Sequence, residues 1–155
     1  MKFVLPTAVL LFAATPALSA DAIYLKCANE MTAESTGINA GKQVKKIETT
    51  SETAFFKIIP ADNRFASYSS SSTPGELKWD EATITDKALS ANISENNELM
   101  EVNGVLTVEL NPPGALTSKI SAAAFGMITS EIDIVGTCVA IEESEFEEGL
   151  KKPSS

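Results

Sequence analysis

The side chains of this sequence that could do chemistry are almost all carboxylates. The chain has 155 residues, of which 21 are Asp or Glu, and it contains no histidine. Without histidine, the sequence excludes Ser-His and Cys-His nucleophile pairs, imidazole general bases and His-ligated zinc sites. We predict no catalytic residue, no bound metal and no cofactor, and we expect the protein not to be an enzyme.

One group of acids comes closest to a hydrolytic site. Asp80 and Glu81 directly follow Trp79, and Asp86 lies shortly after them. Glycoside hydrolases use two carboxyl groups about 5 to 10 Å apart across a sugar, and an aromatic ring can stack on that sugar. Because nothing in this spacing marks one acid as the proton donor, we favour exposed acids at a strand edge and keep a carboxylate-based hydrolase as an alternative.

Three other side chains are candidate ligand contacts: Arg64, Trp79 and Tyr68. Arg64 is the only arginine, and its guanidinium could hold a carboxylate through two parallel hydrogen bonds. By default, we expect it to pair with one of the protein's own acids. Glu131 and Asp133 would share a strand face, but the sequence has no Asp-x-Asp-x-Asp-Gly calcium loop, so we predict a solvated strand start there.

Residues 1–20 predict export of the protein. One lysine, an apolar stretch from Phe3 to Ala14 and small residues up to Ala20 have the layout of a secretory signal peptide. The apolar stretch is shorter than the roughly 20 residues that cross a hydrocarbon core of about 30 Å. We therefore expect no membrane span once the leader is cleaved after Ser19 or Ala20, and a periplasmic or secreted protein.

The acidic balance of the chain excludes some partners. The net charge is −9, and because the first twenty residues carry one lysine and no acid, their removal leaves −10. Such an excess of negative charge argues against nucleic acid and anionic lipid as partners. We expect a protein or a small molecule as the partner, with an identity that the sequence does not specify.

The two cysteines, Cys27 and Cys138, predict one disulfide. An exported protein meets an oxidising compartment, which favours pairing of an even number of thiols. A redox-active pair would need Cys-x-x-Cys spacing, which the sequence lacks. Each cysteine falls on the apolar face of a predicted strand, so the bond should join the terminal strands inside the core.

Strand-like patterns place most of these side chains on β-strands. Apolar and polar residues alternate, or β-branched and aromatic residues cluster, in segments 22–28, 53–59, 64–69, 99–110 and 132–141. Turn residues at 60–63 should join the second and third segments into a hairpin. We predict a mainly β domain at residues 21–141: a small antiparallel sandwich or partly closed barrel of about six to eight strands, with at most one short helix.

The other segments lack a sustained period of two. We predict a long loop at 29–51, a bulge or break near residues 86–87, a short helix at 117–129, and an acidic flexible tail or short exposed helix at 142–155. Asn103-Gly104 is a strong hairpin-turn signal. Because apolar and polar residues alternate without a break through these two residues in segment 99–110, we favour a single strand there.

After the leader, short motifs follow in a fixed order along the chain: Tyr24-Leu25-Lys26-Cys27, Phe56-Lys57-Ile58, Arg64-Phe65, Ile84-Thr85, Val102-Asn103-Gly104-Val105-Leu106 and Gly136-Thr137-Cys138. This series resembles small exported β-rich proteins of unknown function, with a signal peptide and two cysteines, from cyanobacteria and proteobacteria. The resemblance implies the compartment and the fold, and it assigns no activity.

A second pattern concerns Tyr24-x-x-Cys27 and the stretch from Ala66-Ser67-Tyr68 through Trp79-Asp80-Glu81-Ala82. It is similar to periplasmic inhibitors of c-type lysozyme, which are small disulfide-bonded barrels. We thus expect an exported, non-catalytic binding or structural domain, with inhibition of an extracellular hydrolase such as lysozyme as the first alternative.

Overall fold

The structure, a computed structural model, describes residues 21–39, 41–70, 77–124 and 127–151. The predicted signal peptide lies outside these residues. The described elements, in chain order, are β1 Ile23–Asn39, β2 Lys42–Ile59, the 3-10 turn η1 Pro60–Asp62, β3 Arg64–Ser69, β4 Lys78–Glu81, β5 Thr83–Ile84, β6 Ala88–Asn96, β7 Met100–Leu110, β8 Pro113–Ala124, β9 Ile128–Ala140 and α1 Glu143–Lys151.

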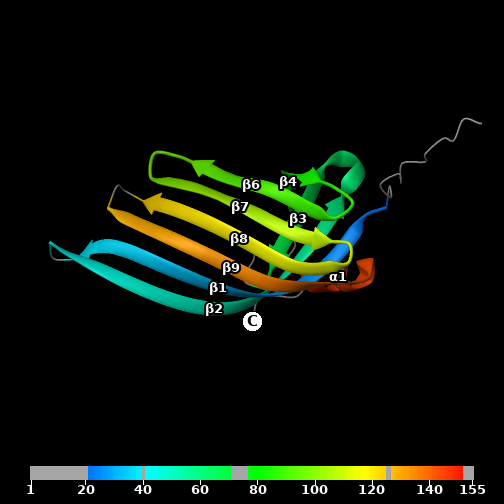
Figure 1. The fold of residues 1–155 in the computed structure, drawn as a ribbon, viewed down its shortest axis with the longest axis horizontal. Coiled ribbons are helices and arrows are strands. Elements are labelled where there is room, and N and C mark those ends of the chain that lie inside the picture. Colours follow the sequence, from blue (N-terminus) through cyan, green and yellow to red (C-terminus); the bar gives the residue numbers. More distant parts are fainter. Residues whose placement is uncertain (1–20, 40, 71–76, 125–126, 152–155) are drawn as a thin grey trace, which may run out of the picture.

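All nine described strands belong to one antiparallel sheet, which curls until its two edges meet. The strand order is β4-β3-β2-β1-β9-β8-β7-β6-β5 (Figure 1). β4 and β5 are at opposite edges, yet only Ala82 separates them in sequence. The mainly β prediction is therefore confirmed, as a nearly closed barrel rather than a sandwich, with nine strands in place of six to eight.

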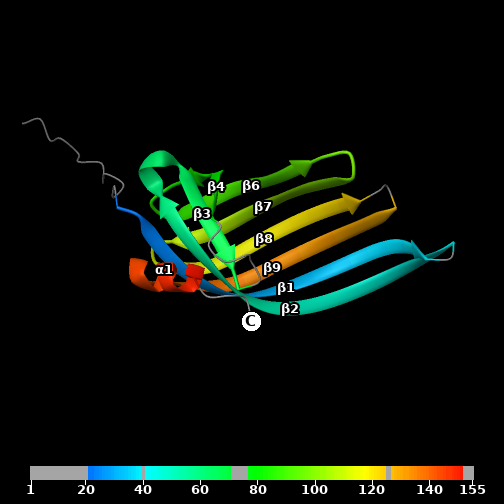
Figure 2. The ribbon, with the colours of Figure 1, turned by 180° about the vertical axis from the view of Figure 1, so that it is seen from behind.

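The barrel is closed at one end only. β3 pairs with residues 54–59 of β2, and β5 pairs with Leu89 and Ser90 of β6. Beyond these pairs, β2, β1, β9, β8, β7 and β6 continue as an open, curved sheet that extends away from α1 (Figures 1 and 2). We call this part the arm; it comprises residues 30–39, 41–53, 91–104, 119–124 and 127–135.

Alternation along each strand gives the sheet an inner and an outer face. In the barrel, the inner face holds the buried apolar core, which includes Leu25, Phe56, Leu89, Val108 and Leu116. The apolar residues at every second position are what predicted these strands. They also fix the register, because a shift by one residue would turn the whole apolar set outward.

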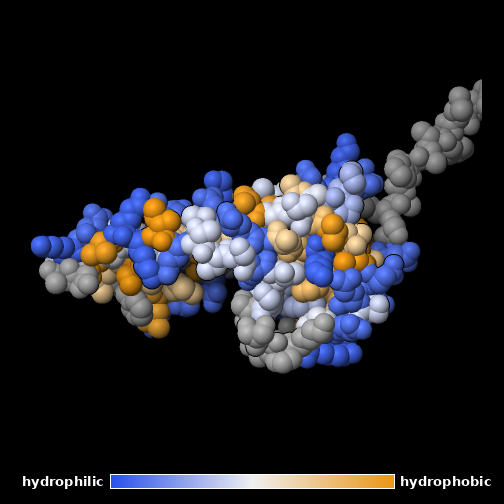
Figure 3. All heavy atoms as spheres, turned by 90° about the horizontal axis from the view of Figure 1, so that it is seen from below, coloured by the Kyte–Doolittle hydropathy of each residue, from blue (hydrophilic) through white to orange (hydrophobic). Residues whose placement is uncertain are grey.

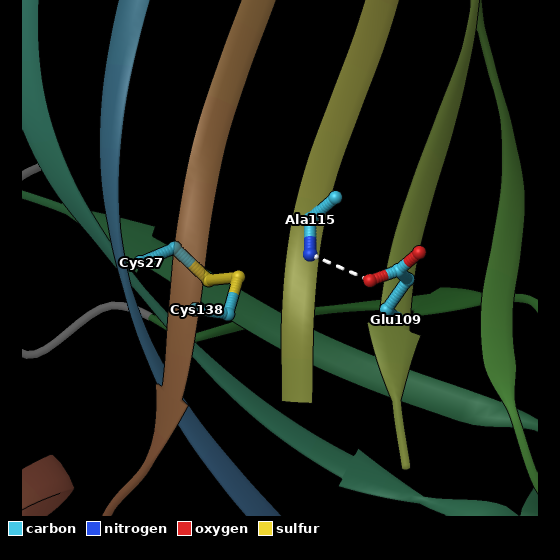
Figure 4. The surroundings of a disulfide bond; sticks show 4 residues. All are labelled: Cys27, Glu109, Ala115 and Cys138. Carbon is cyan, nitrogen blue, oxygen red and sulfur yellow. Dashed lines mark hydrogen bonds between the residues drawn. A yellow bond between two sulfur atoms is a disulfide. The ribbon is translucent and has the colours of Figure 1, made fainter. Parts of the chain in front are cut away.

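The disulfide lies within this core and joins β1 to β9. Cys27 and Cys138 stand opposite each other in the register of the two strands, with their Cα atoms 4.0 Å apart, and both are buried (Figure 4). The predicted bond between terminal strands is confirmed.

The predicted long loop at 29–51 is wrong, because this segment forms the arm strands of the β1–β2 hairpin. Their connection includes Gly41, whose φ of 78° suits glycine. All residues from 41 to 51 are exposed, so the segment carries no apolar face to be recognised. Backbone pairing and cross-strand contacts hold it instead, among them the ion pair of Lys45 with Glu34 at 2.6 Å.

The predicted helix at 117–129 is also wrong. Residues up to Ala124 belong to β8, and β9 begins at Ile128. Leu116, Ile120 and Ala124 are four residues apart, and a spacing of four keeps residues on one face of a strand as well as of a helix. The spacing that indicated a helix was thus equally compatible with the strand.

Three turn predictions are confirmed. The β2–β3 hairpin turns through η1 and ends at Asn63, which has a φ of 51°. A break separates β5 from β6 at residues 85–87. β7 runs through Asn103-Gly104 as a single strand, and a Cβ on Gly104 would approach the carbonyl oxygen of Lys119 to 2.6 Å, so glycine permits the close pairing with β8 there.

The acidic C-terminal segment, predicted as a flexible tail or exposed helix, forms the packed helix α1. Phe146 is fully buried against the outer face of the sheet, with ring centroids 5.5 Å from Tyr24 and 5.1 Å from Tyr68. An ion pair of Lys26 with Glu145 at 2.9 Å adds to the contact. The single aromatic residue among many acids is what docks the helix.

Removal of the disulfide should lower stability without changing the fold. The bond spans 111 residues, and loss of such a bond costs about 2 to 5 kcal/mol in small exported domains. We expect the double variant Cys27→Ala, Cys138→Ala to lose that much free energy of unfolding in urea, and the reduced native protein to match it. A loss below about 0.5 kcal/mol would contradict a core role for the bond.

Candidate functional site

A cavity lies inside the barrel at the level where β3 ends and the arm begins. Its volume is about 240 Å³, and strands from both sides of the barrel line it. Ser69, the last residue of β3, marks its rim beside Ala54 of β2. The site is thus placed by topology, because the short closing strands stop where the longer ones continue.

The walls of the cavity are mainly apolar. The apolar lining residues come from β2, β6, β7, β8 and β9 and are Ala54, Phe56, Ile93, Leu106, Leu116, Ile120 and Ile134. Each belongs to the inward set of its strand. An apolar wall of this kind, combined with few polar groups, is typical of small-molecule pockets.

The polar residues of the lining are Asn29, Glu52, Ser67, Tyr68, Ser69 and Ser118, and two of them, Asn29 and Ser118, each have a buried side-chain oxygen without a hydrogen-bond partner among the described residues. Asn29 is 7% exposed and Ser118 is 4% exposed, and both line the cavity. The unpartnered atoms are Oδ1 of Asn29 and Oγ of Ser118. An unpaired buried polar atom costs about 1 to 3 kcal/mol, so these two atoms require an explanation.

The position of the Asn29 side chain depends on Gly136. Asn29 stands opposite Gly136 in the register of β1 and β9, and a Cβ on that glycine would overlap Oδ1 of Asn29. The absent side chain therefore gives the amide room above β9, between β1 and β8. Farther along the same inner face, Ser35 and Ser130 are hydrogen-bonded to each other at 2.8 Å. Polar residues on this face can therefore be satisfied locally, and Asn29 and Ser118 are not.

The electrostatics of the cavity are those of a nearly uncharged site. Glu52 of β2 is the one charged residue among the described residues that line it. A single carboxylate at the wall disfavours a ligand with a negative charge.

Arg64 and Trp79, two of the predicted contacts, come together on the outer face of the barrel. The guanidinium lies 4.7 Å from the centroid of the indole ring, and Nη2 is 3.1 Å from Oδ2 of Asp62. Arg64 thus pairs with one of the protein's own acids, as expected by default. These two side chains are separate from the cavity.

Tyr68, the third predicted contact, lies apart from them and is one of the residues that line the cavity. Its ring lies under α1, stacks on Phe55 with centroids 4.8 Å apart, and its hydroxyl donates to the carbonyl oxygen of Phe146 at 2.6 Å. Burial raises the pKa of Tyr68 to about 12, and the carboxylates of Glu147 and Glu145 add to this rise. The side chain holds the helix on the sheet.

The predicted acid groups are not gathered around a cleft. Asp80 and Glu81 are successive residues of β4, so they point to opposite faces, and Asp86 lies in the turn after β5. On the arm, Asp133 pairs with Lys119 at 2.9 Å, which raises the pKa of that lysine. Within the described ranges, no three acidic or thiol side chains are arranged to hold a metal ion.

Sequence reasoning missed both Asn29 and Ser118. The polar stretch at 29–51 predicts a loop for Asn29, and the apolar spacing at 117–129 predicts a helix for Ser118. The signal for Asn29 was present, because it continues the spacing of two that begins with Leu25 and Cys27. A polar residue that continues such a series is expected to point into the barrel.

Comparison with family models, with curated proteins and with solved structures finds no match for this chain. In the part that the structure describes, no helix has the length and apolar character needed to cross a membrane.

The unpartnered hydroxyl of Ser118 should reduce stability in the free protein. We expect Ser118→Ala to raise the free energy of unfolding by about 1 kcal/mol, because it removes a buried group that has no hydrogen bond. Ser130→Ala is the matched control on the same face, and it should lower the free energy because it leaves the Ser35 hydroxyl without its partner. Urea unfolding measures both, and a loss of stability in both variants would show that Ser118 is hydrogen-bonded.

The buried hydroxyl of Tyr68 should make the protein sensitive to alkali. An unfolded tyrosine has a pKa of about 10, whereas that of Tyr68 is raised to about 12. Between these two values the unfolded chain binds fewer protons than the folded one, so stability falls as the pH rises. Ultraviolet titration should show a late phenolate step that Tyr68→Phe removes; titration of both tyrosines together near pH 10 would contradict the assignment.

Proposed function

We propose that this chain is an exported, non-catalytic domain that binds an apolar small molecule in the barrel cavity. The observation that carries the proposal is the pair of buried, unpartnered oxygen atoms of Asn29 and Ser118 in a largely apolar wall. A buried polar atom without a hydrogen bond lowers the free energy of unfolding. A ligand that forms a hydrogen bond with each of these two atoms would offset that loss.

The size and surroundings of the cavity support a ligand larger than water. Its volume of about 240 Å³ exceeds the roughly 30 Å³ that one water occupies in the liquid, and an ordered water needs two to four polar partners. Most of the lining side chains offer none. An apolar molecule with a few polar atoms matches the lining better than a cluster of waters does.

Export is supported by two independent features. Residues 1–20 have the layout of a signal peptide, and Cys27 and Cys138 form a disulfide, which persists in oxidising compartments. Both features support a periplasmic or secreted location. Inhibition of an extracellular hydrolase stays a prediction, since no contact among the described residues favours it over ligand binding.

The proposal is tested with the neutral, environment-sensitive probe N-phenyl-1-naphthylamine. The native protein should enhance its fluorescence with one site per chain. Ala54→Phe fills the cavity and should weaken binding at least tenfold. Ala115→Phe is the matched control, because Ala115 is exposed on the outer face of β8, and it should bind like the native protein.

A second variant that blocks the cavity allows the test to be made if Ala54→Phe does not fold. Ile93 lines the same cavity and is only partly buried, so Ile93→Phe should be tolerated and should also weaken binding. Circular dichroism confirms the fold of each variant. Absence of binding to the native protein, or equal binding by all variants, would overturn the proposal.

A further inference from the structure

We infer that the ligand is a single-chain amphiphile whose uncharged head pairs with Asn29 and Ser118 and whose alkyl chain lies along the inner face of the arm. This inference rests on the proposed function. It specifies the chemistry and the orientation of the bound molecule, which the cavity alone does not.

The two unpartnered atoms specify the hydrogen bonds that the head must offer. Oδ1 of Asn29 only accepts, so it needs a donor, whereas Oγ of Ser118 can donate or accept. The two residues lie on β1 and β8 with β9 between them, and the Asn29 amide leans over Gly136 toward β8. A head that carries both a donor and an acceptor, such as a hydroxyl or an amide, satisfies both atoms.

Charge in the head group would be unfavourable. A carboxylate carries acceptors only, so it would leave Oδ1 of Asn29 unpaired and would add a negative charge beside Glu52. An ammonium could donate and Glu52 would attract it, but both receiving side chains are more than nine-tenths buried, and moving a charge out of water costs more than moving a neutral group. The site therefore selects an uncharged head.

The inner face of the arm provides the path for the chain. From the cavity outward, β9 presents Ile134, Ile132 and then Ile128 on this face, and β8 presents Ile120, Ala122 and Ala124. These residues are half-buried or exposed, and between Ile132 and Ile128 this face also carries Ser130, which is hydrogen-bonded to Ser35. The strip is therefore mainly apolar, and it lacks a cover among the described residues. The apolar strip is continuous with the cavity wall, since Ile134 and Ile120 belong to both.

The length of this strip sets the length of the chain. Ile134 and Ile128 are six residues apart, which is about 20 Å along a strand at roughly 3.3 Å per residue. An extended alkyl chain advances about 1.25 Å per carbon, from a bond length of about 1.5 Å. The arm thus accommodates a chain of about 16 carbons.

The outer face of the same strands has the opposite character. It carries the ion pair of Lys119 with Asp133, and next to it Glu131 and Ser121. The β2 side of the arm is also mainly hydrophilic, with scattered apolar side chains (Figure 3). On β8 and β9 the inner face of the arm is therefore the more apolar of the two, whereas the inner positions of β2 include the ion pair of Lys46 with Glu48.

The head is tested by displacing the naphthylamine probe with four dodecyl compounds: dodecanol, dodecanamide, dodecanoate and dodecylammonium. At pH 7 the alcohol or the amide should displace it at concentrations at least tenfold lower than the two ions. Ser118→Ala and Asn29→Ala should each lower this selectivity about fivefold, the equivalent of one hydrogen bond. Ser121→Ala, on the outer face of the same strand as Ser118, should keep the native selectivity.

The path of the chain is tested with alcohols of 8 to 16 carbons. Each added methylene that leaves water should strengthen binding about fourfold. Ala122→Asp places a charge on the inner face. In this variant the affinity should stop rising with chain length at the shorter alcohols. Ala123→Asp, on the outer face, should keep the native dependence on chain length.

The outcomes separate this inference from the proposed function. If the probe binds in the cavity but the ions compete as well as the alcohol and the amide, the head assignment is wrong and the binding function stands. If affinity does not rise with chain length, the chain does not follow the arm. If sedimentation shows a dimer that excludes the long alcohols, a second copy covers the arm and the inference is overturned.

Discussion

The connection of two edge strands by one residue is the constraint on which this structure depends. Ala82 lies between β4 and β5, so the two ends of a nine-stranded sheet have to lie side by side. The closing strands have only four and two residues, whereas β1 and β2 have 17 and 18. The long strands therefore extend beyond the closed part of the sheet. One sheet thus forms both the barrel and the arm, and the cavity lies at their boundary.

A second, smaller core on the outside of the barrel has a different role. α1 covers part of the outer face of β1, β2 and β3 through Phe146, and Tyr68 and Tyr24 pack against that ring. Contacts with charged residues surround it, including those of Glu143 with the Tyr24 hydroxyl and with Lys57, which lower the pKa of Glu143. The wall on this side of the barrel is therefore buried on its inner face and partly covered on its outer face. The cavity and the helix thus use opposite faces of the same strands.

Sequence patterns predicted the barrel well and the arm poorly. In the barrel one face of each strand is buried, so apolar residues recur at every second position and also placed Cys27 and Cys138 inside. In residues 41–51 both faces are exposed, and no such pattern exists. The site is not predicted for a related reason. Asn29 and Ser118 are polar residues at inward-facing positions where apolar residues are expected. Without knowledge of the neighbouring strands, a polar residue at such a position favours the prediction of a loop. The strand of Asn29, β1, pairs with β9, which lies far away in sequence, and Ser118 faces inward only once β8 is recognised as a strand.

The arm leaves one row of backbone groups open to other molecules. Residues 42–51 of β2 pair with β1 on one side and with no described strand on the other. Such a row can template the growth of a sheet from chain to chain, which is how soluble β-proteins turn into fibres. Four charged side chains stand along it: Lys42, Lys45, Lys46 and Glu48. Docking of a second strand would remove water from these charges, so the polar segment that sequence analysis does not recognise as a strand also opposes polymerisation.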